Sequence, residues 1–463
     1  MNIFVISLRP RISDGLARQV RPVTCGHSSL VFVLIINMSI SASQQLVSII
    51  AKAVKDIEED ISARIPGGIP TDVNLPQVAP EEKLPLTTQR RDAIRTLKAA
   101  TYQLFSNLMP VDLQVLDLHY SYFQTVAVGI VVEARIADVI HSLDPDSSKG
   151  GVPIEVLAQK AGMDPRKLTH TLRFLALRNV FCELTLNHWG NTRSSFPLRT
   201  DSPNSQWNYL KTNRENVALP ALTKLPGVFL DKETGGAFSW DPTQAAFQKY
   251  YQPDCGFFEF LEKSDGGLKA EMFGKSMIEL AKATGSGAAE YSTFDWKKLG
   301  SSGLLVDVGG GIGGAACDIS TYLPEWKIVV QDRPKVVENG KQNHVEKGLS
   351  ANIEFEEADF FQDQPAHRAG QVDVYFVRRV LHDWPYESCV QILTYLRRSA
   401  KATTRLLICE TGLVPALVDK TSPILSNGGM ASSLAHNLNL AMLTLFNSEE
   451  RTFSDFTMKC SQQ

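Results

Sequence analysis

The sequence predicts an α/β protein in which a doubly wound parallel sheet follows a mostly helical region. From Gly303 onward, short apolar runs alternate with helix-like stretches, which is the pattern of β-α-β units. Before that point, apolar residues recur mostly at helical spacing. The chain has 463 residues, more than one compact core usually spans, so we expect more than one domain.

The composition of the chain argues against several classes of function. The net charge of −3 gives no overall attraction to nucleic acid or to anionic lipid. The 7 cysteines are scattered without a CxxC pair, and no His/Asp/Glu group has metal-ligand spacing. The sequence therefore predicts neither a metal site nor a disulfide framework. Reduced thiols fit a reducing compartment, and we expect a cytoplasmic protein.

The first residues stand apart from the rest. Arginines precede an apolar run at residues 30–36, but this run lies too far from the start for a signal peptide. It is also shorter than the about 20 apolar residues of a transmembrane helix. Met38 looks like a natural start, so residues 1–43 are predicted to be disordered or an extension of the gene model.

Residues 44–205 are predicted to be a helical region that contains a winged-helix unit. Asp164 can cap a helix that has Pro165 at its first position. Residues 180–184 and a turn near Gly190 suggest a small hairpin after that helix. The predicted helices are residues 44–64, 87–109, 123–140, 154–161 and 166–178.

A winged helix can bind DNA, and its third helix carries Arg166, Lys167, Arg173 and Arg178. Four basic residues are also an ordinary solvated helix face, while the leucines of the same helix have the spacing of core residues. We therefore favour a packing or dimerisation role over DNA binding.

Residues 206–300 are predicted to be a helical connector, in which residues 257–261 and 272–283 form either a pocket wall or core. Residues 301–463 are predicted to be the sheet domain. Its expected strands are residues 304–308, 327–331, 353–356, 372–377 and 405–409. Ligands of such sheets bind at the carboxyl ends of the strands, and the unusual residues of this chain fall there.

A glycine-rich turn follows the first of these strands and opens a helix, which suits a nucleoside-containing ligand. Gly309, Gly311 and Gly313 let the backbone turn sharply and approach a ligand without an intervening Cβ. Gly309, Gly311 and Gly314 also satisfy GxGxxG, so NAD binding is an alternative. Asp332, at the end of the next strand, can bind ribose hydroxyls in either case.

Later strand ends add further candidates. Asp359 and Phe360 follow the third strand, where an acid can receive an adenine amino group and an aromatic ring can cover the base. His382 follows the fourth strand, and histidine can take a proton near neutral pH. A cofactor cradle beside a base suggests group transfer to an acidic hydroxyl.

The ordered series of these motifs resembles the plant and fungal O-methyltransferases that use S-adenosylmethionine. The caffeic-acid type is the familiar plant example, and the closest resemblance is to fungal enzymes acting on aromatic polyketides. It covers residues 44–459 and implies a Rossmann-like class I methyltransferase sheet, a winged-helix dimerisation domain and a homodimer. The matching segments are residues 305–313, 331–332, 358–360 and 378–384, Glu410, and residues 449–452.

The resemblance also assigns cofactor contacts. It implies that the glycines bind the methionine part of S-adenosylmethionine, that Asp332 binds the ribose, and that Asp359 and Phe360 bind the adenine. A basic residue four before the histidine contacts the cofactor in the family, which selects Arg378. Strand alternation gives Arg378 the same parity as His382. The glycines are Gly309, Gly310, Gly311 and Gly313.

Methyl transfer from a sulfonium is an in-line displacement in which the enzyme aligns the acceptor oxygen, the methyl carbon and the sulfur. A phenol with a pKa of about 10 needs a base within hydrogen-bond reach at neutral pH. His382 is the predicted base, and the resemblance supplies Glu410 and Glu450 to hold its ring. Asp383 is expected to cap the next helix and Trp384 to pack beneath the site. The reaction needs no metal.

The C-terminus departs from the family, whose members continue into closing strands at the sheet edge. Residues 453–463 are predicted to begin a helix instead, so we expect a truncated gene model or an inactive product. Two alternatives stay open: an NAD-dependent oxidoreductase and a non-catalytic regulator that keeps the winged helix. The late glycine turn and the lack of a Tyr-x-x-x-Lys pair disfavour the first, and His382 with its two glutamates disfavours the second.

Overall fold

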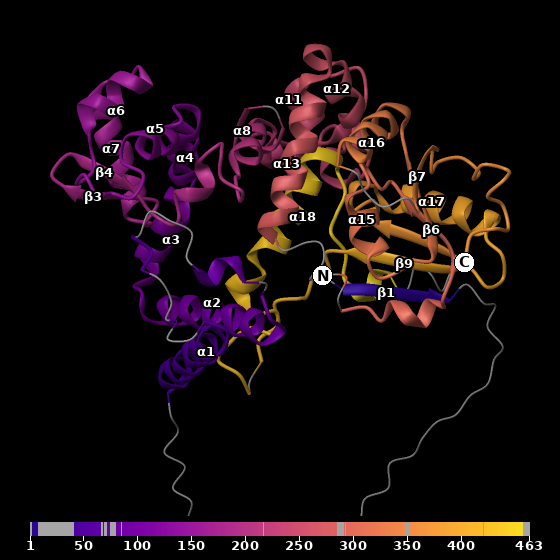
Figure 1. Cartoon of the computed structure of the whole chain (residues 1–463), viewed down its shortest axis with the longest axis horizontal. Coiled ribbons are helices and arrows are strands. Elements are labelled where there is room, and N and C mark those ends of the chain that lie inside the picture. Colours follow the sequence, from indigo (N-terminus) through magenta and orange to yellow (C-terminus); the bar gives the residue numbers. More distant parts are fainter. Residues whose placement is uncertain are drawn as a thin grey trace, which may run out of the picture.

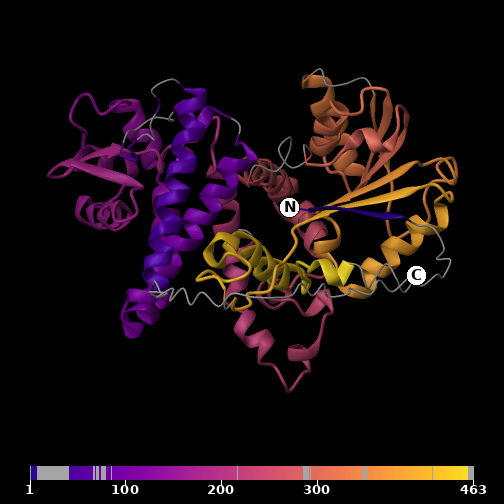
Figure 2. The same ribbon diagram turned by 90° about the horizontal axis from the view of Figure 1, so that it is seen from below.

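The computed structural model describes residues 2–7, 41–65, 68, 72–74, 80–84, 86–215, 217–284, 291, 293–347, 352–419 and 421–456. Helices within residues 42–176 form one lobe, and the six-stranded sheet with its covering helices forms the other (Figure 1). The helices of residues 207–284 and 433–446 lie between these lobes in both views (Figures 1 and 2). The predicted order of a helical region before a parallel sheet is confirmed.

The first two helices lie side by side at one end of the helical lobe (Figure 1). Helix α1 begins with a capping box, in which Ser41 and Gln44 satisfy each other's backbone amides. Thr87 caps α2 by accepting from the Arg90 amide. The helices of this lobe are α1 (Ala42–Arg64), α2 (Thr88–Leu108), α3 (Val111–Tyr120), α4 (Tyr122–Glu133), α5 (Ile136–Leu143), α6 (Ile154–Ala161) and α7 (Pro165–Ala176).

Helices α5 to α7 and a three-stranded antiparallel sheet form the predicted winged-helix arrangement. The sheet has the order β2 (Val152–Pro153), β4 (His188–Asn191), β3 (Phe181–Thr185). Asp164 caps α7 as predicted, accepting from the Lys167 amide. The predicted helix at residues 123–140 is instead split into α4 and α5, because Arg135 between them has a φ of 53°. The guanidinium of Arg173 pairs with Glu183 of β3 at 2.7 Å, so this basic side chain serves the unit's own packing.

Helix α3 and the start of α4 present an apolar surface that the described part of the chain leaves open. Residues 111–133 are long and apolar enough to cross a membrane by length and composition alone, and 22% of their apolar window is buried. The second half of α4 nevertheless packs into the winged-helix core through Val131 and Val132. We call the exposed part the α3 surface; it comprises Leu108, Val111, Val115, Leu118, Tyr122 and Phe123.

The connecting helices pack around an aromatic core. Phe257 contacts the rings of Phe247 and Phe446 edge-on, at 5.1 Å and 4.9 Å between centroids. The two segments predicted as pocket wall or core fall in α12 and α13, and buried Phe257 belongs to this core. The helices are α8 (Trp207–Glu215), α9 (Ala218–Leu222), α10 (Leu225–Phe229), α11 (Ala246–Tyr251), α12 (Phe257–Lys263), α13 (Leu268–Thr284) and α18 (Ser433–Phe446).

The large sheet has the strand order β1-β9-β8-β5-β6-β7, and β5 to β9 are parallel. All five predicted strands are present: β5 (Gly303–Val308), β6 (Trp326–Asp332), β7 (Ile353–Glu357), β8 (Val374–Arg378) and β9 (Arg405–Glu410). Helix α15 (Gly314–Ser320) packs on one face and α17 (Tyr386–Ser399) on the other, while α16 (Pro334–Lys347) follows β6. Parallel strands bring their carboxyl ends to one edge, where the candidate residues collect.

The N-terminal strand differs from the sequence expectation. Residues 1–43 were expected to be disordered or outside the protein, but β1 (Asn2–Ser7) pairs antiparallel with β9, Asn2 opposite Glu410 and Ser7 opposite Arg405. Figure 1 shows it along the sheet edge. An edge strand has unpaired backbone N–H and C=O groups that can bond to another extended segment. Residues 3–6 are apolar and partly β-branched, which favours the extended conformation, and so they can pair with β9. Residues 8–40, which include the apolar run and Met38, lie outside the described residues.

Candidate active site

The glycine loop, residues 309–314, joins β5 to α15. Gly309 and Gly311 have φ values of 67° and 61°, a left-handed backbone that favours glycine. The amide of Gly309 donates to the Gln331 carbonyl at 2.8 Å, and that of Gly311 donates to Asp332 Oδ2 at 2.9 Å. A Cβ at Gly309 would lie 2.7 Å from Val380, whereas one at Gly311 would enter open space. The loop therefore packs tightly against the sheet at Gly309 and leaves free space beside Gly311.

Two carboxylates lie against this loop. Asp332 ends β6, and burial raises the pKa of its carboxyl although the amides of Arg333 and Gly311 bond to it. Asp307 is buried within β5, and its Oδ2 has no hydrogen-bond partner among the described residues. Burial raises the pKa of Asp307 to about 7, with Arg378 opposing and Asp332 adding to the rise. A loop with acids beneath it fits a ligand that carries hydroxyl groups and positive charge.

Arg378 ends β8 on the face of the sheet that Asp307 shares. Its guanidinium carbon lies 5.8 Å from the centre of the Tyr291 ring, and its charge lowers the pKa of Asp307. The expectation that Arg378 and His382 point the same way because of strand alternation was wrong. Strand β8 ends at Arg378, and Arg379 has a φ of 51°, so the alternation does not continue to His382. Contact between Arg378 and a cofactor stays a prediction.

The predicted adenine residues lie in different surroundings. Asp359 is exposed, and its Oδ1 accepts from the Phe361 amide at 2.9 Å. The ring of Phe360 borders the glycine loop, since one of its atoms lies 3.6 Å from the Cβ position of Gly309. Trp384 meets both Phe360 and Phe361 edge-on, as expected for a residue that packs beneath the site.

His382 lies in a short turn, η7 (Leu381–Asp383), after β8. Its Nδ1 is 2.9 Å from Glu450 Oε1, and its Nε2 is 3.4 Å from Asp383 Oδ1. Glu410, at the end of β9, accepts from the amides of Val380 and Leu381 at 3.0 Å and 2.8 Å. The fold thus brings the three predicted catalytic residues together. We call His382, Asp383, Glu410 and Glu450 the His382 cluster.

The carboxylates around His382 determine the protonation of its ring. Burial by itself disfavours the imidazolium, but the negative charges of Asp383, Glu410 and Glu450 outweigh it and raise the pKa of His382 to about 10. Burial also raises the pKa of Asp383 to about 7, with Glu410 and Glu450 adding to the rise and His382 opposing it. Burial raises the pKa of Glu410 as well.

The sequence showed no cluster at metal-ligand spacing, but the fold assembles one from distant segments. Atoms of His382, Glu410 and Glu450 lie within 4.8 Å of one another. Glu410 Oε1 is bonded to two backbone amides, and Nδ1 of His382 to Glu450, so these hydrogen bonds account for the arrangement. We assign no metal here.

Known proteins with related sequences identify the family. A family model described as the O-methyltransferase domain matches residues 244–463. O-methyltransferase tpcA of Aspergillus fumigatus is 30% identical to this chain, covering 82% of it and 85% of tpcA. The chain belongs to this O-methyltransferase family. O-methyltransferase gedA of Aspergillus terreus is also 30% identical, covering 79% of this chain and 81% of gedA.

Solved structures agree on the fold of the O-methyltransferase. The human N-acetylserotonin methyltransferase covers 76% of this chain and 92% of its own, with a TM-score of 0.58 and 21% identity. The LaPhzM structure has a TM-score of 0.60 at 23% identity, covering 76% of this chain and 93% of its own. Neither the NAD-dependent oxidoreductase nor the non-catalytic regulator finds support among these relatives.

Arg451 is a site residue of the O-methyltransferase that the sequence reasoning missed. Its side chain is 1% exposed, and its Nη1 and Nη2 donate to the carbonyls of Leu381 and Trp384, both at 2.6 Å. These bonds hold the turn that carries His382. The signal available in the sequence was its position directly after Glu450.

One expectation was wrong. Asp383 does not cap α17, whose N-cap is Pro385 without a side-chain bond; it faces His382 instead. Asn447, directly after α18, donates to the carbonyls of Ser239 and Asp241 and is buried together with Met442 and Phe446.

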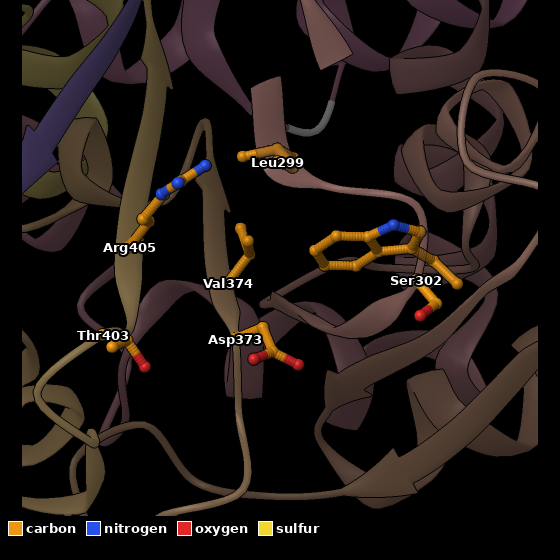
Figure 3. A pocket seen from close by; sticks show the side chains of 7 residues that line it. Leu299, Ser302, Asp373, Val374, Thr403 and Arg405 are labelled. Carbon is orange, nitrogen blue, oxygen red and sulfur yellow. The ribbon is translucent and has the colours of Figure 1, made fainter. Parts of the chain in front are cut away.

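A shallow pocket lies at the opposite, amino edge of the sheet (Figure 3). Its charged groups are already engaged: Asp373 accepts from the Leu304 amide and pairs with Lys401, and Arg405 donates to the Lys298 carbonyl. These contacts tie strand starts together, so this pocket is separate from the site. It is lined by Leu299, Ser302, Trp326, Asp373, Val374, Thr403 and Arg405.

Proposed function

We propose that this O-methyltransferase moves a methyl group from S-adenosylmethionine to a phenolic hydroxyl of an aromatic, polyketide-derived molecule. The observation that carries the proposal is the His382–Glu450 pair, held by Glu410 and Arg451 at the sheet edge that also carries the glycine loop. His382 is the proposed base, and Glu410 and Glu450 are the proposed positioning acids.

The residues at the loop fit S-adenosylmethionine. The space at Gly311 admits a ligand against the backbone, Asp332 offers a carboxylate for ribose hydroxyls, and Phe360 offers a ring for adenine. We propose that Gly309, Gly310, Gly311, Gly313, Asp332, Asp359, Phe360 and Arg378 contact this cofactor. When bound, it supplies an electrophilic methyl group on a positively charged sulfur.

The residues of the chain then have separate tasks. Glu450 holds Nδ1 of His382, which leaves Nε2 as the atom that takes the acceptor proton. Glu410 and Arg451 fix the backbone on either side of the ring, so the base keeps one position. In a displacement reaction the enzyme contributes mainly by aligning the reacting groups, and these contacts keep the proposed base aligned.

The acceptor class is supported by related proteins. The neocarzinostatin enzyme NcsB1, with 23% identity and a TM-score of 0.52, was solved with 2-hydroxy-5-methyl naphthoic acid and with 1,4-dihydroxy-2-naphthoic acid. Both are aromatic and hydroxylated. We propose that the present enzyme takes an acceptor of that kind, in the cytoplasm, where its free cysteines stay reduced.

The test is calorimetric binding to the full chain, with NADH as the control ligand, followed by a methylation screen on phenolic polyketides. We expect S-adenosylmethionine to bind and NADH not to bind. Binding of NADH alone, or of neither ligand to a folded sample, would overturn the cofactor assignment. Mass spectrometry of the product decides whether oxygen is methylated.

We further propose a homodimer in which a second copy covers the α3 surface. Leu118 and Val115 are 73% and 65% exposed there, more than an isolated chain tolerates over so continuous an apolar stretch. We also propose that residues 44–205 serve this assembly, that residues 206–300 form the connector, and that residues 301–463 carry the chemistry.

Light scattering tests the dimer. Leu118→Glu should convert the protein to monomer, whereas Leu177→Glu, at an 80% exposed residue that ends α7, should not. A dimer that survives Leu118→Glu together with Val115→Glu would reject the α3 surface as the interface.

A further inference from the structure

The His382 cluster holds more negative than positive charge. Three carboxylates (Asp383, Glu410 and Glu450) surround one imidazole, and Glu410 and Glu450 are 1% and 2% exposed. The cation nearest to them along the chain is Arg451, whose guanidinium is bonded to backbone carbonyls. Even with His382 protonated, the fully ionised cluster keeps two net negative charges, or one if the charge of Arg451 is counted with it.

Among the described residues, the neighbouring helices contribute uncharged groups to the surroundings of this cluster. From α17, Cys389 donates its thiol to the Leu381 carbonyl, and from α18, Asn439 accepts from the Glu450 amide. His436 of α18 lies 3.5 Å from Asn427. Across the glycine loop, Asp307 is another acid, and Arg378 lies beside Tyr291 on that face.

In such a site His382 keeps a proton, although its proposed role is to accept one. The Nδ1 hydrogen bond to Glu450 and the 3.4 Å approach of Asp383 to Nε2 give both ring nitrogens an acidic partner. An imidazolium has no lone pair at Nε2 and cannot act as a base. A base in this setting therefore needs an event that removes its proton.

We propose that His382 is an imidazolium in the ligand-free protein and that, at alkaline pH, it releases its Nε2 proton to solvent when a positively charged methyl donor binds at the glycine loop. The neutral, demethylated form of the donor leaves the proton in place. This inference rests on the proposed function, since it requires S-adenosylmethionine as the ligand.

The expected size of the effect follows from the reaction's own geometry. A base in contact with the acceptor, which itself contacts the methyl group, lies about 7 Å from the donor's charge. With an effective dielectric constant of about 20, a unit charge at that distance lowers a pKa by about 1–2 units. Starting from a pKa of about 10, this releases about 0.4–0.8 proton per site near pH 9.

The experiment compares S-adenosylmethionine with S-adenosylhomocysteine on the full chain, because the two ligands differ only in the methyl group and its charge. Calorimetry near pH 9, in buffers of different ionisation enthalpy, counts the protons released on binding. NMR titration of the ¹³C-labelled histidine rings, assigned with His382→Gln, reports the same group directly. The His367 resonances, from an exposed ring paired with Glu356, report any general change.

We expect proton release and a lower His382 pKa with S-adenosylmethionine, and neither with S-adenosylhomocysteine. Equal behaviour with the two ligands, or a ligand-free His382 that titrates at its ordinary value, would overturn the inference while leaving the proposed function standing. Failure of both ligands to bind would overturn the proposed function as well.

A pair of variants separates the cluster from general charge effects. Glu450→Gln removes a carboxylate that bonds to His382, so the ligand-free protein should already lose much of the proton and release less on binding. Glu449→Gln makes the same change one residue earlier, at a side chain that is 39% exposed and adjoins Arg451. Its proton release should match that of the unaltered protein, and equal losses in both variants would contradict the assignment to the cluster.

Discussion

The glycine loop and the His382 cluster lie at the same edge of the sheet but are built in opposite ways. The loop is a backbone structure, in which amides bond to Gln331 and Asp332 and three glycines have left-handed φ values. The cluster is a set of buried side-chain charges from three separate segments. A backbone site should be sensitive to any added Cβ, whereas a charge cluster should be sensitive to the loss of a single partner.

The largest expected effect comes from His382→Gln, which removes the proposed base while keeping a polar side chain. We expect kcat to fall by about 10²–10⁴-fold and the Kd for S-adenosylmethionine not to rise, because the loop supplies binding and the imidazolium that repels the donor's charge is gone. Steady-state kinetics and calorimetry measure the two. His367→Gln, at a ring that is 63% exposed, is the control and should keep full activity. A parallel loss of affinity in His382→Gln would contradict the separation of loop and cluster.

Arg451→Met tests the support of the cluster. It removes the guanidinium donors from the buried carbonyls of Leu381 and Trp384, and a hydrogen bond to a charged group contributes about 1.5–3 kcal/mol. The free energy of unfolding, measured in urea, should fall accordingly. Arg398→Met, at a guanidinium that is 60% exposed and pairs with Asp363, should cost less than about 1 kcal/mol. Similar losses in the two variants would show that Arg451 is not a special support.

Gly311→Ala tests the loop. The left-handed backbone there costs alanine about 1–2 kcal/mol, and the added Cβ enters the open space proposed for the cofactor. We expect weaker binding of S-adenosylmethionine together with unchanged His382 resonances in the ligand-free protein. Gly274→Ala in α13, where an added Cβ meets nothing within 4 Å, should stabilise the protein by about 0.5–1 kcal/mol. Unaltered cofactor affinity in Gly311→Ala would place the ligand elsewhere.

The stability of the protein should itself depend on pH. A histidine whose pKa rises on folding stabilises the folded state below its ordinary pKa of 6.5 and loses that contribution as the pH rises through about 10. The difference in unfolding free energy between the unaltered protein and His382→Gln should therefore shrink across this window. Urea denaturation at pH 6, 8 and 10 measures it. A difference that is constant with pH would mean that His382 is not held as an imidazolium.

Much of this architecture could be predicted from local patterns. The five parallel strands and the Asp164 cap follow from periodicity and from short-range chemistry, which neighbouring elements do not overrule. The split of residues 123–140 at Arg135 could not be predicted, since an apolar helical pattern does not show where one residue turns left-handed. Nor could β1, because pairing with β9 depends on an edge that exists only in the folded sheet.

The sequence by itself determined the fold class and the family. It also selected His382, Glu410 and Glu450 as the candidate catalytic residues, because each of these conclusions rests on residue type and order along the chain. Only the tertiary structure decided which charges meet. Asp383 faces His382 instead of capping α17, Arg451 holds the turn, and Glu450 lies 2.9 Å from Nδ1 although it is far away in sequence. Electrostatic interactions depend on distance and burial, which a linear pattern does not contain, and so the protonation of His382 is a property of the fold.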